Sequence, residues 1–124
     1  MKERRKILIV DDNKNIRSLV RRVIDGVSSD MFDIQECSDG AEAVISYAAS
    51  QSDLIIMDIA MPQKDGITAA EEITSHDHSA KIIFLTQHPV SEYSFLKKRQ
   101  GVMAVISKED VGELQKELKL FFPK

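Results

Sequence analysis

The chain has 124 residues, of which 17 are basic and 20 are acidic, and its formal net charge is -3. This length suits one domain, 1–124, with its own hydrophobic core and no second domain. Its apolar runs, such as 54–57, are far shorter than the roughly 18 residues of a membrane-spanning helix, and no predicted helix carries a basic stripe. We therefore expect a cytoplasmic domain that neither enters a membrane nor binds nucleic acid by itself.

The first third of the chain predicts a strand, a helix and a second strand. An apolar strand covers 5–10. Asn13 or Asn15 then caps a helix over 16–27, in which apolar residues recur at helical spacing. A shorter strand follows over 31–37.

The middle of the chain is organised around the run 54–57, which has no polar alternation. Such a run is typical of a parallel strand that is covered on both faces. An Asp-Gly turn at 39–40 precedes a second helix before this strand, and a third helix with a thin apolar side follows the loop 61–66. The apolar positions of the second helix are Ala41, Val44, Ile45 and Ala48.

The last part of the chain predicts a fourth strand over 81–85, a fourth helix over 90–99, a fifth strand over 102–106 and a last helix over 111–122. Five strands therefore alternate with five helices. This alternation predicts an α/β fold, because right-handed crossovers between such strands build a parallel sheet.

Polar side chains stand where four of these strands end. Asp11 and Asp12 follow the first strand, Asp58 the central one, Thr86 the fourth and Lys108 the fifth. The carboxyl ends of parallel strands line one edge of the sheet, where ligands bind. Three carboxylates so close together resist full ionisation unless a cation lies between them, and Mg²⁺ takes oxygen ligands of this kind. A mutually neutralised cluster explains any one of these groups alone, but all four strand ends together favour a site for magnesium and a phosphoryl group.

These motifs resemble the signature of response-regulator receiver domains in their order and spacing. They are Val10-Asp11-Asp12, Met57-Asp58-Ile59-Ala60-Met61-Pro62 with Asp65-Gly66, Leu85-Thr86 and Ile106-Ser107-Lys108. The resemblance covers nearly the whole chain. It implies a flavodoxin-like, doubly wound sheet of five parallel strands in the order 2-1-3-4-5.

The resemblance also implies a role for each site residue. Asp58 accepts a phosphoryl group from a phosphohistidine on a sensor histidine kinase or phosphotransfer protein. The metal ligands are Asp12 directly, Asp11 mainly through a metal-bound water, Asp58, and the backbone carbonyl of Ala60. The domain is then a phosphoryl acceptor, with only slow self-catalysed phosphotransfer and dephosphorylation.

Two further residues hold the transferred group in this family. Lys108 pairs with the phosphoryl oxygens, and Thr86 donates a hydrogen bond to the same group after transfer. The signal is expected to reach an output domain, a partner or a second copy through the face made by the fourth helix, the fifth strand and the last helix. The ending Ser-Lys-Glu-Asp is similar to that of receivers joined to DNA-binding output domains.

Three positions depart from the commonest form of the family. Glu109 follows the lysine where many receivers have a cis proline, and we expect a trans peptide because a non-proline cis bond costs about 2.5 to 4 kcal/mol. Gln87 replaces a small residue and is expected to screen Asp58. Val105 replaces an aromatic switch residue, so we expect the signal to travel through the segment 87–99.

Other functions are compatible with parts of the pattern. One alternative is an interaction module that is never phosphorylated. The complete set of acids, threonine and lysine at the strand ends argues against it, because such a module would not need these residues. A magnesium-dependent phosphohydrolase of the aspartyl-phosphate type needs a second acid where this chain has Ala60. A flavodoxin needs a phosphate-binding loop after the first strand, where the charges of Asp11 and Asp12 repel phosphate.

Overall fold

The computed structural model describes residues 4–123 of the 124-residue chain. Its strands form one parallel sheet in the order β2-β1-β3-β4-β5. The strands are β1 (Arg5–Val10), β2 (Phe32–Cys37), β3 (Leu54–Asp58), β4 (Ile82–Thr86) and β5 (Val102–Ser107). The helices are α1 (Lys14–Val27), α2 (Gly40–Ser50), α3 (Gly66–His76), η1 (Val90–Lys98) and α4 (Val111–Phe121). The α/β fold class and the strand order implied by the resemblance are confirmed.

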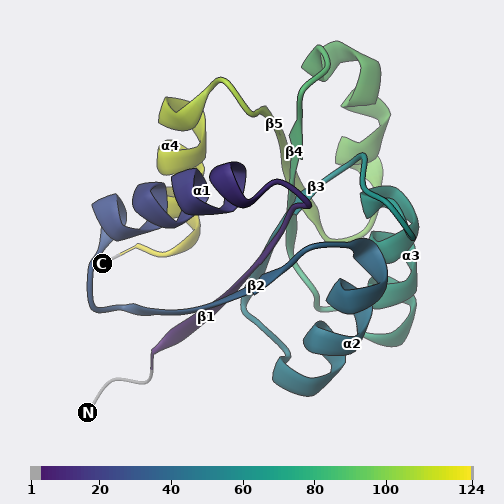
Figure 1. Ribbon diagram of the computed structural model, residues 1–124, viewed down its shortest axis with the longest axis horizontal. Coiled ribbons are helices and arrows are strands. Elements are labelled where there is room, and N and C mark those ends of the chain that lie inside the picture. Colours follow the sequence, from purple (N-terminus) through teal and green to yellow (C-terminus); the bar gives the residue numbers. More distant parts are fainter. Residues whose placement is uncertain (1–3, 124) are drawn as a thin grey trace.

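Helices cover both faces of the sheet (Figure 1). α1 and α4 pack together on one face, and α2 and α3 pack together on the other. Each face has its own hydrophobic core. Along β3, Leu54 and Ile56 belong to the core on the α1 and α4 side, whereas Ile55 and Met57 belong to the core on the α2 and α3 side. Since successive side chains of a strand point to opposite faces, the coverage of both faces explains why all four positions of β3 before Asp58 are apolar. Within residues 4–123 no helix combines the length and the apolar character needed to cross a membrane.

The buried face of α2 differs from the prediction. The apolar positions were expected at Ala41, Val44, Ile45 and Ala48, but the structure buries Gly40, Ala43 and Tyr47 and leaves Ile45 73% exposed. In a helix of mostly small residues two stripes have helical spacing, and only packing selects between them. The Tyr47 hydroxyl donates a 2.6 Å hydrogen bond to Asp77 Oδ2, which follows α3. That distant partner favours the observed face.

The segment predicted as a continuous fourth helix over 90–99 is instead η1, a run of 3-10 turns. It is broken at Tyr93, whose φ of -119° and ψ of 16° are not helical. Serine, valine and aromatic residues make up much of the segment and have modest helix propensity. Leu96 is the buried residue of η1. Val90 and Tyr93 are partly buried against the same core. The segment therefore has one fully buried anchor and two partial contacts.

Candidate functional site

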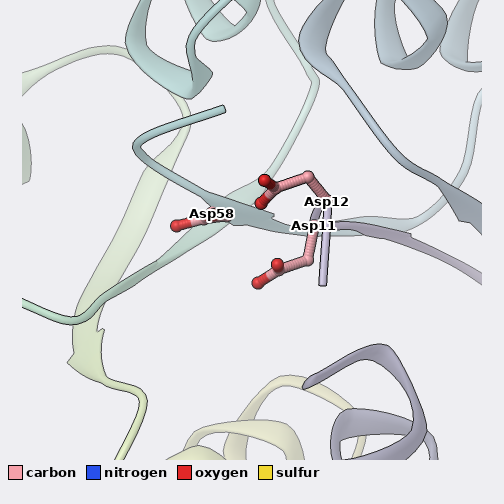
Figure 2. A group of neighbouring side chains, drawn as sticks. All are labelled: Asp11, Asp12 and Asp58. Carbon is pink, nitrogen blue, oxygen red and sulfur yellow. The ribbon is translucent and has the colours of Figure 1, made fainter. Parts of the chain in front are cut away.

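Three carboxylates meet at the carboxyl ends of β1 and β3 (Figure 2). One oxygen from each of Asp11, Asp12 and Asp58 lies within 4.8 Å of the other two. The two strands are parallel neighbours, with Val10 opposite Met57, so their next residues emerge side by side. Figure 2 shows Asp11 and Asp12 leaning from the end of β1 toward Asp58. The structure thus brings together the three acids that the sequence singled out.

Lys108 joins this group from the loop between β5 and α4. Its Nζ lies 3.0 Å from Asp11 Oδ2 and 3.1 Å from Asp58 Oδ1, and its side chain is only 6% exposed. The Lys108 amide donates a 2.9 Å hydrogen bond to the Thr86 carbonyl, which holds the loop against β4. We refer to Asp11, Asp12, Asp58 and Lys108 as the acidic edge.

Burial and charge change the ionisation of the acidic edge. Burial, followed by the charge of Asp11, raises the pKa of Asp58 to about 6 against the opposing effect of Lys108. Burial alone would lower the pKa of Lys108, but its contacts with Asp11 and Asp58 outweigh burial and raise that pKa. Lys108 is therefore held as a cation. One positive charge faces three acids, which leaves the acidic edge negative near neutral pH.

The acidic edge fits a hard divalent cation. Asp11 Oδ2 is buried and forms an ion pair with the Lys108 ammonium at 3.0 Å, without a hydrogen bond of good geometry. A buried acceptor left without a hydrogen bond calls for a compensating partner. Asp12 is exposed and lines the adjoining cavity, which leaves room for water ligands. Carboxylate oxygens together with water are the ligands that Mg²⁺ prefers.

A cavity of about 180 Å³ opens over Asp58. Ala60, Thr86 and Lys108 line it. Thr86 is buried at the end of β4, where its Oγ1 accepts a 2.9 Å hydrogen bond from the His88 amide and donates one of 3.2 Å to the His88 carbonyl. All the predicted site residues except Asp11 therefore border this space directly, and Asp11 lies behind it against Lys108.

The loop after β3 passes so close to the strand that only glycine fits at its end. A Cβ on Gly66 would lie 2.1 Å from the Asp58 carbonyl oxygen. The Gly66 amide donates a 2.7 Å hydrogen bond to the Ile59 carbonyl, and Asp65 caps α3 through the Thr68 amide. These contacts close the loop and keep Ala60 beside Asp58.

The structure adds residues that the sequence did not assign to the site. Asn13, His88 and Tyr93 line the same cavity as Gln87. His88 follows β4 within two residues, so its place at this edge could have been inferred from the strand ends. Tyr93 reaches the cavity from the break in η1, for which the sequence offers no signal. The screening role of Gln87, which is exposed here, remains a prediction.

The other departures from the family pattern also have defined places. The Lys108–Glu109 peptide is trans, as predicted. Val105 is buried in the core on the α2 and α3 side of the sheet, together with Phe84 and Leu96. No aromatic ring therefore stands at this position of β5.

Comparisons with known proteins agree on one family. The family model for the response regulator receiver domain matches residues 7–119. The chain is 40% identical over 83 residues to the chemotaxis protein CheY of Halobacterium salinarum, which covers 66% of each chain. It is 31% identical over 112 residues to YxjL of Bacillus subtilis, described as an uncharacterized transcriptional regulatory protein, covering 90% of this chain and 51% of YxjL. The chain thus spans just under two thirds of the first relative and about half of the second.

Solved structures give the same result. The CheX-CheY-BeF3-Mg complex from Borrelia burgdorferi contains a chain that is similar with a TM-score of 0.84 and 27% identity. The match covers 97% of this chain and 90% of that one. The likeness therefore extends over the whole sheet and its helices.

Proposed function

The chain belongs to the response regulator receiver domain family, and we propose that it accepts a phosphoryl group on Asp58 from a phosphohistidine of a sensor histidine kinase or a phosphotransfer protein. Receiver domains are signalling modules and not conventional enzymes. We expect only slow self-catalysed phosphotransfer and dephosphorylation. The observation that carries the proposal is the contact of 3.1 Å between Asp58 Oδ1 and Lys108 Nζ beside an open cavity.

In the proposed transfer, an oxygen of the Asp58 carboxylate bonds to phosphorus while the bond from phosphorus to the donor's imidazole nitrogen breaks. Such a reaction depends on positioning and on charge neutralisation. Lys108 orients the Asp58 carboxylate and offers a cation to the phosphoryl oxygens. Thr86 Oγ1 presently donates to the His88 carbonyl, and the same hydroxyl can donate to a phosphoryl oxygen in the cavity.

We further propose that Asp11, Asp12, Asp58 and the carbonyl of Ala60 hold Mg²⁺. When bound, the ion supplies positive charge that offsets the charge of the phosphoryl group. Asp12 is suited to direct ligation because it is exposed at the cavity, and Asp11 to ligation through water because Lys108 already contacts it. The relative from Borrelia burgdorferi is described as a complex with BeF3 and Mg, which supports this proposal.

The output surface that we propose is the face of η1, β5 and α4. Each of these elements exposes large apolar surface, with Phe95 at 49% on η1, Met103 at 47% on β5, and Val111 at 41% and Leu120 at 67% on α4. We propose that an output domain, a partner protein or a second copy covers this face. YxjL extends well beyond the matched region and is described as a transcriptional regulatory protein, which supports an output domain that acts in transcription. The proposed place of action is the cytoplasm.

Intact mass spectrometry tests the phosphorylation. Wild-type protein treated with a small acyl phosphate and magnesium should gain one phosphoryl group, and Asp58→Asn should gain none. Asp65→Asn is the matched control, because Asp65 is an exposed acid of the same loop and asparagine can still cap α3. Chelation of magnesium should suppress the gain. A phosphoryl mass on Asp58→Asn would exclude Asp58 as the sole acceptor.

A further inference from the structure

Arg17 connects the first turn of α1 to the turn that carries the two acids of β1. Its Nη1 donates a 2.7 Å hydrogen bond to the Asp11 carbonyl, and its Nε donates one of 2.9 Å to Glu36 Oε1 on β2. The Arg17 side chain is only 18% exposed. The guanidinium thus bridges two elements beside the acidic edge without touching any of its carboxylates.

We propose that Arg17 is a positioning residue for the magnesium site, acting through the backbone of Asp11 on the carboxylate of Asp12. The inference rests on the proposed function. The peptide group is planar, so the Asp11 carbonyl, the Asp12 amide and the Asp12 Cα move together. An anchor on that carbonyl therefore sets the direction in which the Asp12 side chain leaves the chain.

Asp12 depends on such an anchor more than Asp11 does. Asp11 is buried, and its Oδ1 accepts a 2.9 Å hydrogen bond from the Asn13 amide. Asp12 is exposed at the rim of the cavity. Its carboxylate is placed by the backbone, and Arg17 holds that backbone at the Asp11 carbonyl.

Glu36 keeps the guanidinium in place. It accepts hydrogen bonds from Arg17 and from Arg21, one turn further along α1. Burial opposes the ionisation of Glu36, but the hydrogen bonds from Arg21 and Arg17 outweigh it and lower the Glu36 pKa. Arg17 donates from two different nitrogens of one planar group, Nη1 to the Asp11 carbonyl and Nε to the Glu36 carboxylate, and the single ammonium nitrogen of a lysine does not reproduce this geometry.

Arg21 provides a matched control. Both arginines are on α1 and both pair with Glu36, but the hydrogen bonds that Arg21 makes within residues 4–123 do not reach Asp11. If the arginines only formed surface ion pairs, removal of either would have the same small effect. A positioning role instead predicts that only the loss of Arg17 weakens the binding of magnesium.

The test is a titration of wild type, Arg17→Ala and Arg21→Ala with magnesium chloride, followed by the NMR signals of the Asp12 and Asn13 amides. We expect Arg17→Ala to bind magnesium about tenfold more weakly, as for other outer-shell partners of metal ligands, and Arg21→Ala to stay within about twofold of wild type. In the presence of a chelator, the Asp12 amide signal should already be shifted in Arg17→Ala and unshifted in Arg21→Ala. Urea unfolding reports any general loss of stability separately.

The outcomes separate the two levels of inference. Equal affinities of Arg17→Ala and Arg21→Ala, with wild-type binding intact, would overturn the role of Arg17 and leave the magnesium site standing. Absence of binding to wild type would overturn the magnesium site and the role of Arg17 with it. Should Arg17→Ala not fold, Arg17→Lys replaces it. This variant keeps the charge but loses the planar group, so affinity equal to that of Arg21→Ala would again overturn the proposal.

Discussion

The acidic edge and η1 both border the cavity over Asp58, which Tyr93 of η1 lines, but the two regions are built in opposite ways. Asp11 and Asp58 directly continue buried strands, and Lys108 holds both within about 3 Å. η1 is broken at Tyr93 and fully buries only Leu96. The acidic edge is set by neighbouring strands and by charge, whereas η1 depends on one fully buried side chain and on the partial burial of Val90 and Tyr93.

The difference matters for the proposed function, in which the domain accepts a phosphoryl group and signals to a partner. Groups that perform phosphoryl transfer must be held in fixed geometry. A segment that reports the event must have a second conformation of similar free energy, and such segments have few buried contacts. We therefore expect the chemistry to be confined to the acidic edge and the conformational response to η1.

The largest effect should come from removing the one cation of the acidic edge. Lys108→Met should slow phosphorylation by a small acyl phosphate by about 100-fold, because a preorganised partner of the phosphoryl charge is lost. Lys116→Met, which removes an exposed lysine from α4, should leave the rate unchanged. The measurement is the time course of phosphoryl incorporation by intact mass. Similar rates for both variants would mean that Lys108 does not act on the transferred group.

The contribution of Leu96, the fully buried residue of η1, can be tested by truncation. Leu96→Ala should lower the free energy of unfolding by about 2 to 4 kcal/mol, since it opens a cavity in the core. Phe95→Ala, next to it but half exposed, should change that free energy by less than about 0.5 kcal/mol. Urea unfolding measures both. Equal losses would show that η1 is held along its length and not at Leu96.

The burial of Asp58 and the repulsion between the carboxylates of the acidic edge should make the free energy of unfolding depend on pH. The Asp58 pKa of about 6 lies above that of an unfolded chain, so the folded protein binds the extra proton between about pH 4 and pH 6. Stability therefore falls as the pH rises through this window, and the penalty is complete above it. In a chelator at about pH 7.5, Asp58→Asn should be more stable than wild type by roughly 1 to 3 kcal/mol.

The same variant pair supplies its own control for that effect. At about pH 3.5 the wild-type Asp58 is already protonated in the folded state, so the two proteins should unfold at nearly the same denaturant concentration. Saturating magnesium should reduce the difference at the higher pH, because the ion stabilises only the protein with all three acids. A stability gain independent of pH would point to a cause other than charge.

The smallest expected effect concerns the proposed signal. It tests most directly whether η1 responds while the acidic edge keeps its structure. A beryllofluoride mimic bound at Asp58 should change amide hydrogen exchange over 87–99 by about tenfold in rate, or roughly 1.4 kcal/mol, while β1 and β3 remain protected. The reason is that Val105 has no ring to rotate, so Thr86 and its loop must carry the response into η1. Unchanged exchange over 87–99 with the mimic bound would exclude this route.

Much of the fold and of the acidic edge could be read from the chain because both depend on local patterns. Uninterrupted apolar runs such as 54–57 mark strands covered on two faces, and parallel strands bring their carboxyl ends to one edge. Asp11, Asp12, Asp58, Thr86 and Lys108 were therefore found by their position alone. The strand order needed the family resemblance, since periodicity does not say which strands are neighbours.

The remaining features were decided by contacts between residues far apart in the chain. Tyr47 meets Asp77 across 30 positions and so selects the buried face of α2. Arg17 meets Glu36 across 19 positions, which turns an ordinary helix arginine toward the Asp11 carbonyl. η1 is broken at Tyr93, because packing fully buries only Leu96 of its nine residues and their helix propensity is too weak to complete a helix. Periodicity along the chain describes which face a residue can occupy, whereas only the folded arrangement supplies the partner that it meets there.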